Sequence, residues 1–366
     1  MGSRLDNTEA TKHPRLGGEL PLFSDRFGQR YAWPSNWLAF SHGRAALAWL
    51  IERRRPKSAL ICGYTCPTVP AFLRRSSIEP LLFDVGTSLE EIVTLASRLA
   101  APQLVIFPAL FGGPPWRNPK SLAKLLGRSA IVVIDAAQTA FGHRDFPPPP
   151  GGATLSCPRK TTALADGAVL ALGRGMTVGR GTSGLPVAQQ AVAWKYAARA
   201  LWATAKPELE IQALEFNLMS ECAWPDEPRR MSDESRALFE RMDPDWHRTV
   251  RRRNRRTLAA ALAGQIPTWA SERGTPFSLP IFVRDPAALI ADLRAQHIFA
   301  TALWPDSEHD PDRHPAAAYM VRHLVSLPVD QRHDQTDMTR IAAAVLDVAV
   351  PPHWPPPGAL RRMVRL

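Results

Sequence analysis

Asp135 and Lys160 are the two residues of this sequence whose types and positions most suggest chemistry. Asp135 closes an apolar run, 131–134, and Lys160 follows a second short apolar segment, 153–157. A carboxylate favours a positive charge beside it, and an amine with a lowered pKa can form an imine with a carbonyl group. The pair therefore fits a cofactor whose ring nitrogen must stay protonated. Only seven lysines compete for the role of the amine.

Two neighbours extend this hypothetical site, and each residue also has a simpler interpretation. Gln138, three residues after Asp135, could reach an oxygen on the same ring, and Ser156 could offer a hydroxyl to a phosphate. Alternatively, Asp135 caps the turn after its strand, which is a common role for aspartate. Lys160 and Ser156 could equally be ordinary residues of a loop.

The segment 41–47, Ser-His-Gly-Arg-Ala-Ala-Leu, predicts a helix that opens on small residues. Helix amino termini carry free N–H groups and a favourable dipole for phosphate. Gly43 would let the backbone approach such a group, and Ser41 or Arg44 could add contacts. Because glycine is frequent at helix starts, this segment indicates a phosphate site only in combination with the others.

Short apolar runs alternate with helical patterns after residue 42, which predicts an α/β fold. Strands are expected at 59–62, 81–84, 104–107, 130–134, 153–157 and 168–172, and helices at 44–54, 69–75, 89–99 and 119–126. Such a pattern is typical of a large, mostly parallel sheet with helices on both faces, whose ligands lie at the carboxyl ends of the strands. Asp135 stands at such an end.

The predicted organisation has four parts. Residues 1–40 form an irregular arm, 41–245 a large α/β domain, 246–350 a smaller α+β domain, and 351–366 a proline-rich basic tail with little order. A glycine- and arginine-rich loop at 173–184 precedes a mostly helical stretch from 187 to 262. The small domain should contain strands at 277–283 and 323–327 and helices at 285–296 and 335–348.

Composition argues against several other classes of protein. There is no apolar run long enough for a membrane span and no signal-peptide pattern, so we expect a cytoplasmic protein. The four cysteines are too scattered for a disulfide framework, and Cys62 and Cys66 lack the partners of a zinc site. The net charge of +11 would attract small anions or nucleic acid. We interpret the basic run 249–256 as a helix with a solvated arginine face, because no DNA-binding motif accompanies it. The inward face of this helix should carry Trp246, Val250, Leu258 and Leu262.

Taken together, these segments resemble the DegT-type sugar aminotransferases, a fold-type-I family that depends on pyridoxal 5'-phosphate. Residues 41–47 are similar to the family's helix opening, and Asp-Ala-Ala-Gln at 135–138 matches its cofactor strand outright. The segment 156–167 approaches its lysine segment and glycine turn. Three later segments resemble its helical stretches and small-domain ending: 230–235, 251–254 and 304–328.

The resemblance implies roles for the residues around the cofactor ring. Lys160 would form the internal aldimine and then act as general base and acid. Asp135 would keep the ring nitrogen protonated, and Gln138 would bond to the ring oxygen. Cys66 stands where the family often carries a ring-stacking aromatic residue, for which Tyr64 could substitute from nearby.

The resemblance also implies a phosphate seat formed by Gly43, Arg44 and Ser156. Ser156 lies four residues before the lysine, where the family usually has five. Three residues are candidates on the substrate side: Trp304, His323 and His143. Family members are homodimers with the site at the subunit interface, so the loop 173–184 would serve a neighbour's cofactor.

The expected function is that of an aminotransferase. It would convert a keto group of a nucleotide sugar or a related small metabolite to an amine, with an amino acid as donor. One alternative keeps the cofactor but performs an elimination or a condensation on an amino-acid-derived substrate in secondary metabolism. Others are a non-catalytic binding relative or a basic nucleic-acid-binding protein. Sugar dehydratases of the family replace the lysine with histidine, so Lys160 argues against that variant.

Overall fold

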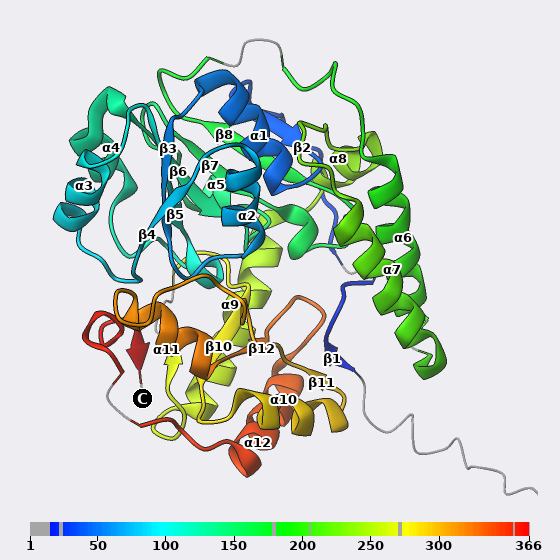
Figure 1. Cartoon of the computed structure of the whole chain (residues 1–366). Helices are drawn as coiled ribbons and strands as arrows, with labels where there is room; N and C mark the ends of the chain where they lie inside the picture. Colours follow the sequence, from blue (N-terminus) through cyan, green and yellow to red (C-terminus); the bar gives the residue numbers. More distant parts are fainter. Residues whose placement is uncertain are drawn as a thin grey trace, which may run out of the picture.

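The computed structural model describes residues 15–21, 25–177, 181–204, 206–269, 273–353 and 356–365. Its central feature is a seven-stranded sheet with the order β2-β8-β7-β6-β5-β3-β4 (Figure 1). The strands are β2 (Trp37–Phe40), β3 (Ser58–Cys62), β4 (Pro80–Phe83), β5 (Gln103–Pro108), β6 (Ala130–Ala136), β7 (Ala153–Ser156) and β8 (Ala168–Leu172). The strands from β4 to β7 are parallel, and β8 is antiparallel to both of its neighbours.

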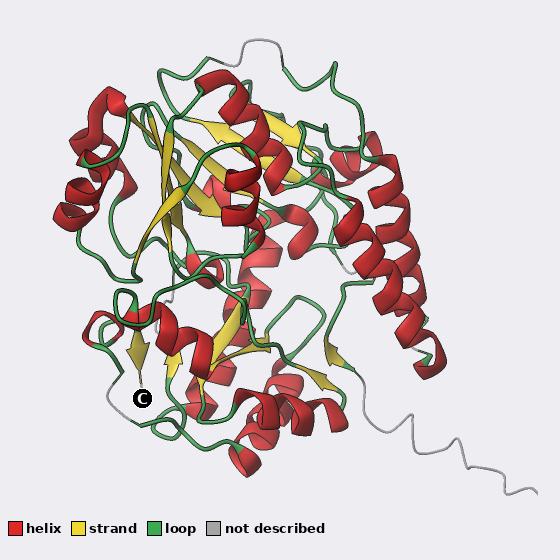
Figure 2. Ribbon diagram, in the orientation of Figure 1, coloured by secondary structure: helices red, strands yellow, loops and turns green. Residues whose placement is uncertain are grey.

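Both faces of this sheet are buried, which explains why its strands are continuously apolar. Successive side chains of β6 alternate between two hydrophobic clusters, with Ile131 and Val133 in one and Ala130 and Val132 in the other. The first cluster includes residues of α1 (Gly43–Arg54) and α2 (Thr68–Arg75), and the second includes residues of α3 (Leu89–Ser97) and α4 (Pro119–Leu126). Figure 2 shows the strands as a twisted layer between helices.

The helices that follow β8 extend the molecule beyond the sheet. They are α6 (Gln189–Ala203), α7 (Glu210–Ala223), α8 (Asp233–Phe239) and α9 (Pro244–Leu262), and the short α5 (Gly142–Asp145) precedes β7. Helices α6 and α7 pack along each other as a hairpin at the right of Figure 1. Helix α9 leads from the large sheet into the smaller part of the molecule.

The smaller part is built on a four-stranded sheet with the order β12-β10-β9-β13. Its elements are β9 (Thr268–Trp269), β10 (Ser278–Phe282), α10 (Pro286–Ala295), β11 (Ile298–Phe299), α11 (Pro315–His323), β12 (Leu324–Pro328), α12 (Gln335–Val348) and β13 (Val364–Arg365). Leu279, Ile281, Leu327 and Ile341 belong to its core. The arm joins this part through β1 (Leu16–Gly17), which pairs with β11.

Two expectations about the ends of the chain are corrected. The arm is not irregular throughout, because 37–40 form an edge strand of the large sheet; residues 1–14 and 22–24 lie outside the described residues. The tail is also more ordered than predicted at 356–365. Leu360 and Val364 are buried there, and β13 pairs with β9 of the small sheet. Residues 354, 355 and 366 lie outside the described residues.

The basic run in α9 also differs from its interpretation as a solvated arginine face. Arg253 and Arg256 are exposed, but Arg251 and Arg255 are buried. The buried arginines are four residues apart and therefore share one face of the helix. That face turns toward the interior, where the guanidinium of Arg251 donates to the carbonyls of three residues: Pro276, Phe277 and Thr161.

Among the described residues, none of the helices combines the length and the apolar character that crossing a bilayer requires.

Candidate active site

The strand order places a crevice at the carboxyl ends of the parallel strands. After β3 the chain moves outward to β4 and then returns to the opposite side of β3 as β5. Ligands of α/β sheets lie where the order reverses in this way. A cavity, here called the central cavity, opens at this edge and is lined by residues that include Gly43, Cys66, Asp135, Gln138, Arg159, Lys160 and Trp304.

Asp135 and Lys160 both line the central cavity, as their chemistry requires. Asp135 is the penultimate residue of β6, and its Oδ1 accepts a hydrogen bond of 3.0 Å from the backbone N–H of Ala137. Lys160 lies in the short turn Pro158–Lys160 after β7, the strand next to β6. Burial raises the pKa of Asp135, and the charge of Lys160 opposes that rise. The two side chains therefore act on each other across one cavity.

Gln138 presents an unused amide to the same cavity. Its Oε1 accepts from the backbone N–H of Phe111, which fixes the orientation of the side chain. Its Nε2 is buried and has no hydrogen-bond partner among the described residues. A buried donor without a partner costs free energy unless a ligand supplies the acceptor. This amide is therefore available to an oxygen of a bound group.

The amino terminus of α1 forms another part of the wall. His42 is the N-cap residue, and its side chain makes no capping hydrogen bond to the first turn. Gly43 leaves little room for a side chain, because an added Cβ would lie 3.2 Å from the Sγ of Cys157. Burial and the nearby Arg159 and Arg44 hold the pKa of His42 well below its usual value. The ring is therefore neutral and packs on Trp224, with centroids 5.1 Å apart.

Two of the residues expected at a phosphate are engaged elsewhere. The guanidinium of Arg44 donates to Asp226 and to the carbonyl of Trp224, although part of its side chain still lines the cavity. The hydroxyl of Ser156 is fully buried and bonds to Nδ1 of His143 at 2.7 Å. Ser156 is not among the residues that line the central cavity. The structure thus brings Gly43 to the cavity but turns the two polar groups away.

The candidates for ring stacking and substrate contact are also divided. Cys66 and Trp304 line the central cavity, whereas Tyr64 lies fully buried behind them and donates its hydroxyl hydrogen to the Leu303 carbonyl. His143 is buried against Trp37, with ring centroids 4.1 Å apart. His323 closes α11 and bonds to the Val283 carbonyl. Neither His143 nor His323 lines the described cavities around Lys160.

A cluster of three buried cations and two partly buried glutamates beside Lys160 was not predicted from the sequence. Arg159 makes two hydrogen bonds to Glu221, and Lys195 lies between Glu221 and Glu19. Arg199 completes the cluster through a 3.0 Å bond to Glu19. Although burial alone would raise the pKa of Glu19, Arg199 and Lys195 hold it below its ordinary value. The only signal in the sequence was the i, i+4 spacing of Lys195 and Arg199.

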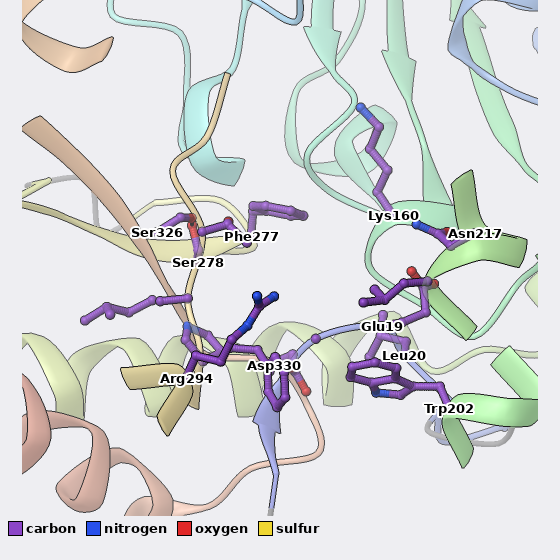
Figure 3. Close-up of a pocket in the computed structure, with 18 of the residues that line it drawn as sticks. Glu19, Leu20, Lys160, Trp202, Asn217, Phe277, Ser278, Arg294, Ser326 and Asp330 are labelled. Atoms are coloured by element: carbon purple, nitrogen blue, oxygen red, sulfur yellow. Dashed lines mark hydrogen bonds between the residues drawn. The ribbon is translucent and has the colours of Figure 1, made fainter. Parts of the chain in front are cut away.

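Two further cavities adjoin Lys160. The side cavity is lined by Gln138, Arg159, Lys160, Lys195, Asn217, Glu221 and Trp304, together with Glu19, Phe277 and Leu303. The outer cavity, about 320 Å³, lies between the arm, α6, α7 and the small sheet. Figure 3 shows that the Lys160 side chain rises away from Glu19, Leu20 and Trp202, so its amine faces the large sheet. Lys160 thus lies between the central cavity at the large sheet and the outer cavity.

The turn that carries Lys160 is tied to the small domain by a single carbonyl. The Thr161 oxygen accepts three hydrogen bonds, from Nε2 of His247 at 3.0 Å, from Arg251 at 3.0 Å and from Gln331 at 3.1 Å. Gln331 also donates to Asp25 of the arm. These contacts hold the backbone of the residue that follows Lys160. Arg251 therefore helps to position the turn that carries the lysine.

Solved structures of aminotransferases share this architecture. An aminotransferase of the DegT DnrJ EryC1 StrS type from Brucella abortus is 15% identical, with a TM-score of 0.55 over 84% of both chains. DesV from S. venezuelae, in complex with a ketimine intermediate, is 13% identical, with a TM-score of 0.56 over 85% of this chain and 84% of that one.

The PLP form of the putative sugar aminotransferase Spr1654 from Streptococcus pneumoniae is 10% identical, with a TM-score of 0.59 over 88% of this chain and 93% of that one. No family model and no curated protein matches the chain. At such identities the likeness concerns the fold, and it confirms the predicted α/β class with fold-type-I architecture.

Proposed function

We propose that this chain is a pyridoxal-phosphate-dependent aminotransferase that converts a keto group of a sugar or a related small metabolite to an amine. The observation that carries the proposal is the convergence of three side chains on one cavity. Asp135, Gln138 and Lys160 supply a carboxylate, a free amide donor and an amine there. The aminotransferases that share the fold support the same assignment.

The residues of the central cavity fit this cofactor. Lys160 would hold it covalently through its amine, and Asp135 would pair with the ring nitrogen. The buried Nε2 of Gln138, which lacks a partner among the described residues, would donate to the ring oxygen. The uncapped amino terminus of α1 at Gly43 would bind the phosphate, because its free N–H groups and its dipole favour an anion. Since Arg44 and Ser156 bond elsewhere, we assign the phosphate to the helix terminus rather than to these side chains.

The chemistry then divides between the cofactor and the protein. When bound, the cofactor supplies an electron sink that lets a C–H bond of the attached substrate ionise. Once the amine of the substrate has displaced it from the cofactor, the freed Lys160 amine would accept that proton and return it to a different carbon, as a general base and then a general acid. The Asp135 carboxylate would keep the ring nitrogen protonated in the buried cavity. An amino acid would be the donor in the first half of the cycle.

The outer cavity is our proposed entrance for the substrate. Its wall combines the indole of Trp202 with polar side chains such as Asn217, Thr301 and Arg294. Aromatic faces and hydrogen-bonding groups together suit a polar ring such as a sugar. The sugar aminotransferase from Streptococcus pneumoniae that shares the fold supports this substrate class.

We also propose that the active form is a homodimer. Helix α7 carries large apolar side chains on its outer face, with Ile211 72% and Leu218 65% exposed and Leu214 and Met219 also exposed. A contiguous exposed stripe of this kind marks an interaction surface. Because Leu214 also lines the outer cavity, a second subunit on α7 would border the substrate entrance.

Borohydride reduction tests the function directly. The purified protein with pyridoxal phosphate should be yellow, and reduction should fix the cofactor to Lys160, as peptide mass spectrometry will show. Lys160→Arg should give no adduct. Lys195→Arg is the matched control, because Lys195 lines the side cavity next to Lys160 and its variant should keep the adduct. A colourless protein, or an adduct on Lys195, would contradict the proposal.

A donor screen separates transamination from other reactions of the same cofactor. The yellow colour should bleach when a suitable amino acid is added and return when a keto sugar is supplied. Colour that persists with every donor would instead favour an elimination, a condensation or a non-catalytic role.

A further inference from the structure

Trp304 has a backbone conformation that a bulky residue rarely adopts. Its φ is 54°, in the left-handed region that favours glycine. Strained backbone of this kind persists only where the surrounding structure holds it, and it concentrates at functional sites. Local contacts must therefore hold Trp304 in this conformation, and we expect a function that offsets its conformational free energy.

The cause is a set of hydrogen bonds that ties the loop of Trp304 to the large domain. The Tyr64 hydroxyl donates to the Leu303 carbonyl at 2.7 Å. On the other side of the tryptophan, the Ser307 hydroxyl lies 2.7 Å from the Gly63 carbonyl oxygen and 3.0 Å from the backbone nitrogen of Thr65. The segment between β11 and α11 is thus fastened to the loop that follows β3.

This fastening directs the indole into the cavities around Lys160. Trp304 lines both the central cavity and the side cavity, and it shares both with Gln138, Arg159 and Lys160. Its ring packs against Tyr64, with centroids 5.3 Å apart, and is half-buried. The indole is therefore buttressed from behind and presents its remaining surface to the cavities.

The loop that follows β3, residues 63–67, offers no aromatic surface to the central cavity. Cys66 lines the central cavity, and its thiol lies 3.1 Å from the hydroxyl of Thr68. Tyr64, the nearest aromatic residue of that loop, is fully buried and does not line the cavity. A planar ring held between Asp135 and Lys160 would therefore meet a thiol from this loop and an indole from Trp304.

We propose that Trp304 is the residue that stacks on the cofactor ring, so that the small domain supplies the aromatic wall that the loop after β3 lacks. This inference rests on the proposed function. Stacked aromatic rings gain free energy beyond the area they bury, and an indole offers the largest face. The gain from stacking would offset the strain at residue 304 when the cofactor is bound.

Two variants separate stacking from a purely structural role. Trp304→Gly relieves the left-handed strain but also removes the packing of the indole on Tyr64, so the cofactor-free protein should unfold at a similar urea concentration. Its dissociation constant for pyridoxal phosphate, measured by titration of the visible absorbance, should rise about tenfold. Trp304→Phe keeps an aromatic face, so its dissociation constant should stay within about threefold of the parent value.

Tryptophan emission gives a readout independent of activity and stability. Cofactor binding should quench the emission of the parent protein, and Trp304→Phe should lose part of that quenching. Trp33→Phe is the control, because Trp33 packs against Trp37 and Phe239 and lines none of the three cavities around Lys160. This variant should keep the full cofactor-dependent change.

The outcomes distinguish this inference from the proposed function. If the parent protein forms no borohydride-stable adduct on Lys160, the proposed function fails, and the inference fails with it. If the adduct forms but Trp304→Gly binds pyridoxal phosphate as tightly as the parent does, only the stacking role is overturned. A variant that changes the Michaelis constant for the substrate but neither affinity nor quenching would likewise overturn it, because Trp304 would then contact the substrate alone.

Discussion

At the scale of single residues, buried histidines such as His143 and His247 link the stability of the protein to pH. Burial lowers the pKa of His143 to about 3, and burial also lowers the pKa of His247 to about 3. In the unfolded chain a histidine titrates near its ordinary value of about 6.5. Below that pH the unfolded chain binds protons that the folded protein does not, so the unfolded state gains in relative stability.

We therefore expect the free energy of unfolding to decrease as the pH falls from about 6.5 toward 3, by up to about 1.4 kcal/mol per pH unit for each histidine. His247→Gln should remove the contribution of His247 while keeping an N–H donor near the Thr161 carbonyl. Urea unfolding at pH 7.5 and 5.5 checks this. The variant should lose about 1.4 kcal/mol less than the parent over that interval. Equal losses would show that His247 does not titrate as described.

The sequence indicated some site residues well and others poorly, for a physical reason. Asp135 could be placed because an apolar β-branched run must be a buried strand, and its end must face the ligand edge of the sheet. The partners of a side chain are set by tertiary packing instead. Nothing near Ser156 in the sequence shows that His143 takes its hydroxyl, or that Asp226 turns Arg44 away from the cavity.

At the scale of elements, the short turn Leu110–Gly112 joins the large sheet to the small domain through close backbone contact. Gly112 has a φ of 77°, and an added Cβ would lie 2.0 Å from the carbonyl oxygen of Thr275. Its neighbour Phe111 accepts a backbone hydrogen bond from Phe277 and donates one to the side chain of Gln138. A shift of this turn would therefore also move Gln138, the proposed donor to the ring oxygen.

We expect Gly112→Ala to destabilise the protein by about 3 kcal/mol and to weaken cofactor binding as well. Gly264→Ala is the matched control, because Gly264 has a φ of 76° but open space around its Cβ position. That variant should cost only the left-handed strain, about 1–2 kcal/mol. Chemical denaturation with cofactor titration checks both. Equal effects of the two substitutions would show that the contact with Thr275 is unimportant.

Elements with strong local signals were predictable, and those that depend on distant partners were not. Helices α4 and α12 begin and end where the sequence predicts, because Asn118 and Asp334 cap their first turns. Helix α11 went unpredicted, since its run of alanines carries little periodic signal; its first turn is capped from afar by Asp84. The apolar residues of the buried face of α9 were predictable, and Val250, Leu258 and Leu262 are indeed buried. The burial of Arg251 and Arg255 on the same helix was not, because arginines are normally solvent-exposed.

At the scale of the whole molecule, the exposed stripe on α7 predicts self-association. Light scattering should give twice the mass of one chain, and Leu218→Lys should shift the protein toward the monomer, because a charge in an apolar interface is costly. Leu125→Lys is the control, since Leu125 is 59% exposed on α4, away from the stripe. A monomeric parent protein, or equal behaviour of the two variants, would contradict the proposed dimer.

The three donors on the Thr161 carbonyl limit how this protein can be recombined with others. A chimera that grafts a foreign small domain after α8 would leave the lysine-bearing turn in place but replace all three donors, His247, Arg251 and Gln331. The recipient would keep its reactive amine and lose the imidazole, the guanidinium and the amide that anchor the adjacent peptide unit. Successful domain grafts will therefore be those that carry donors at these three positions.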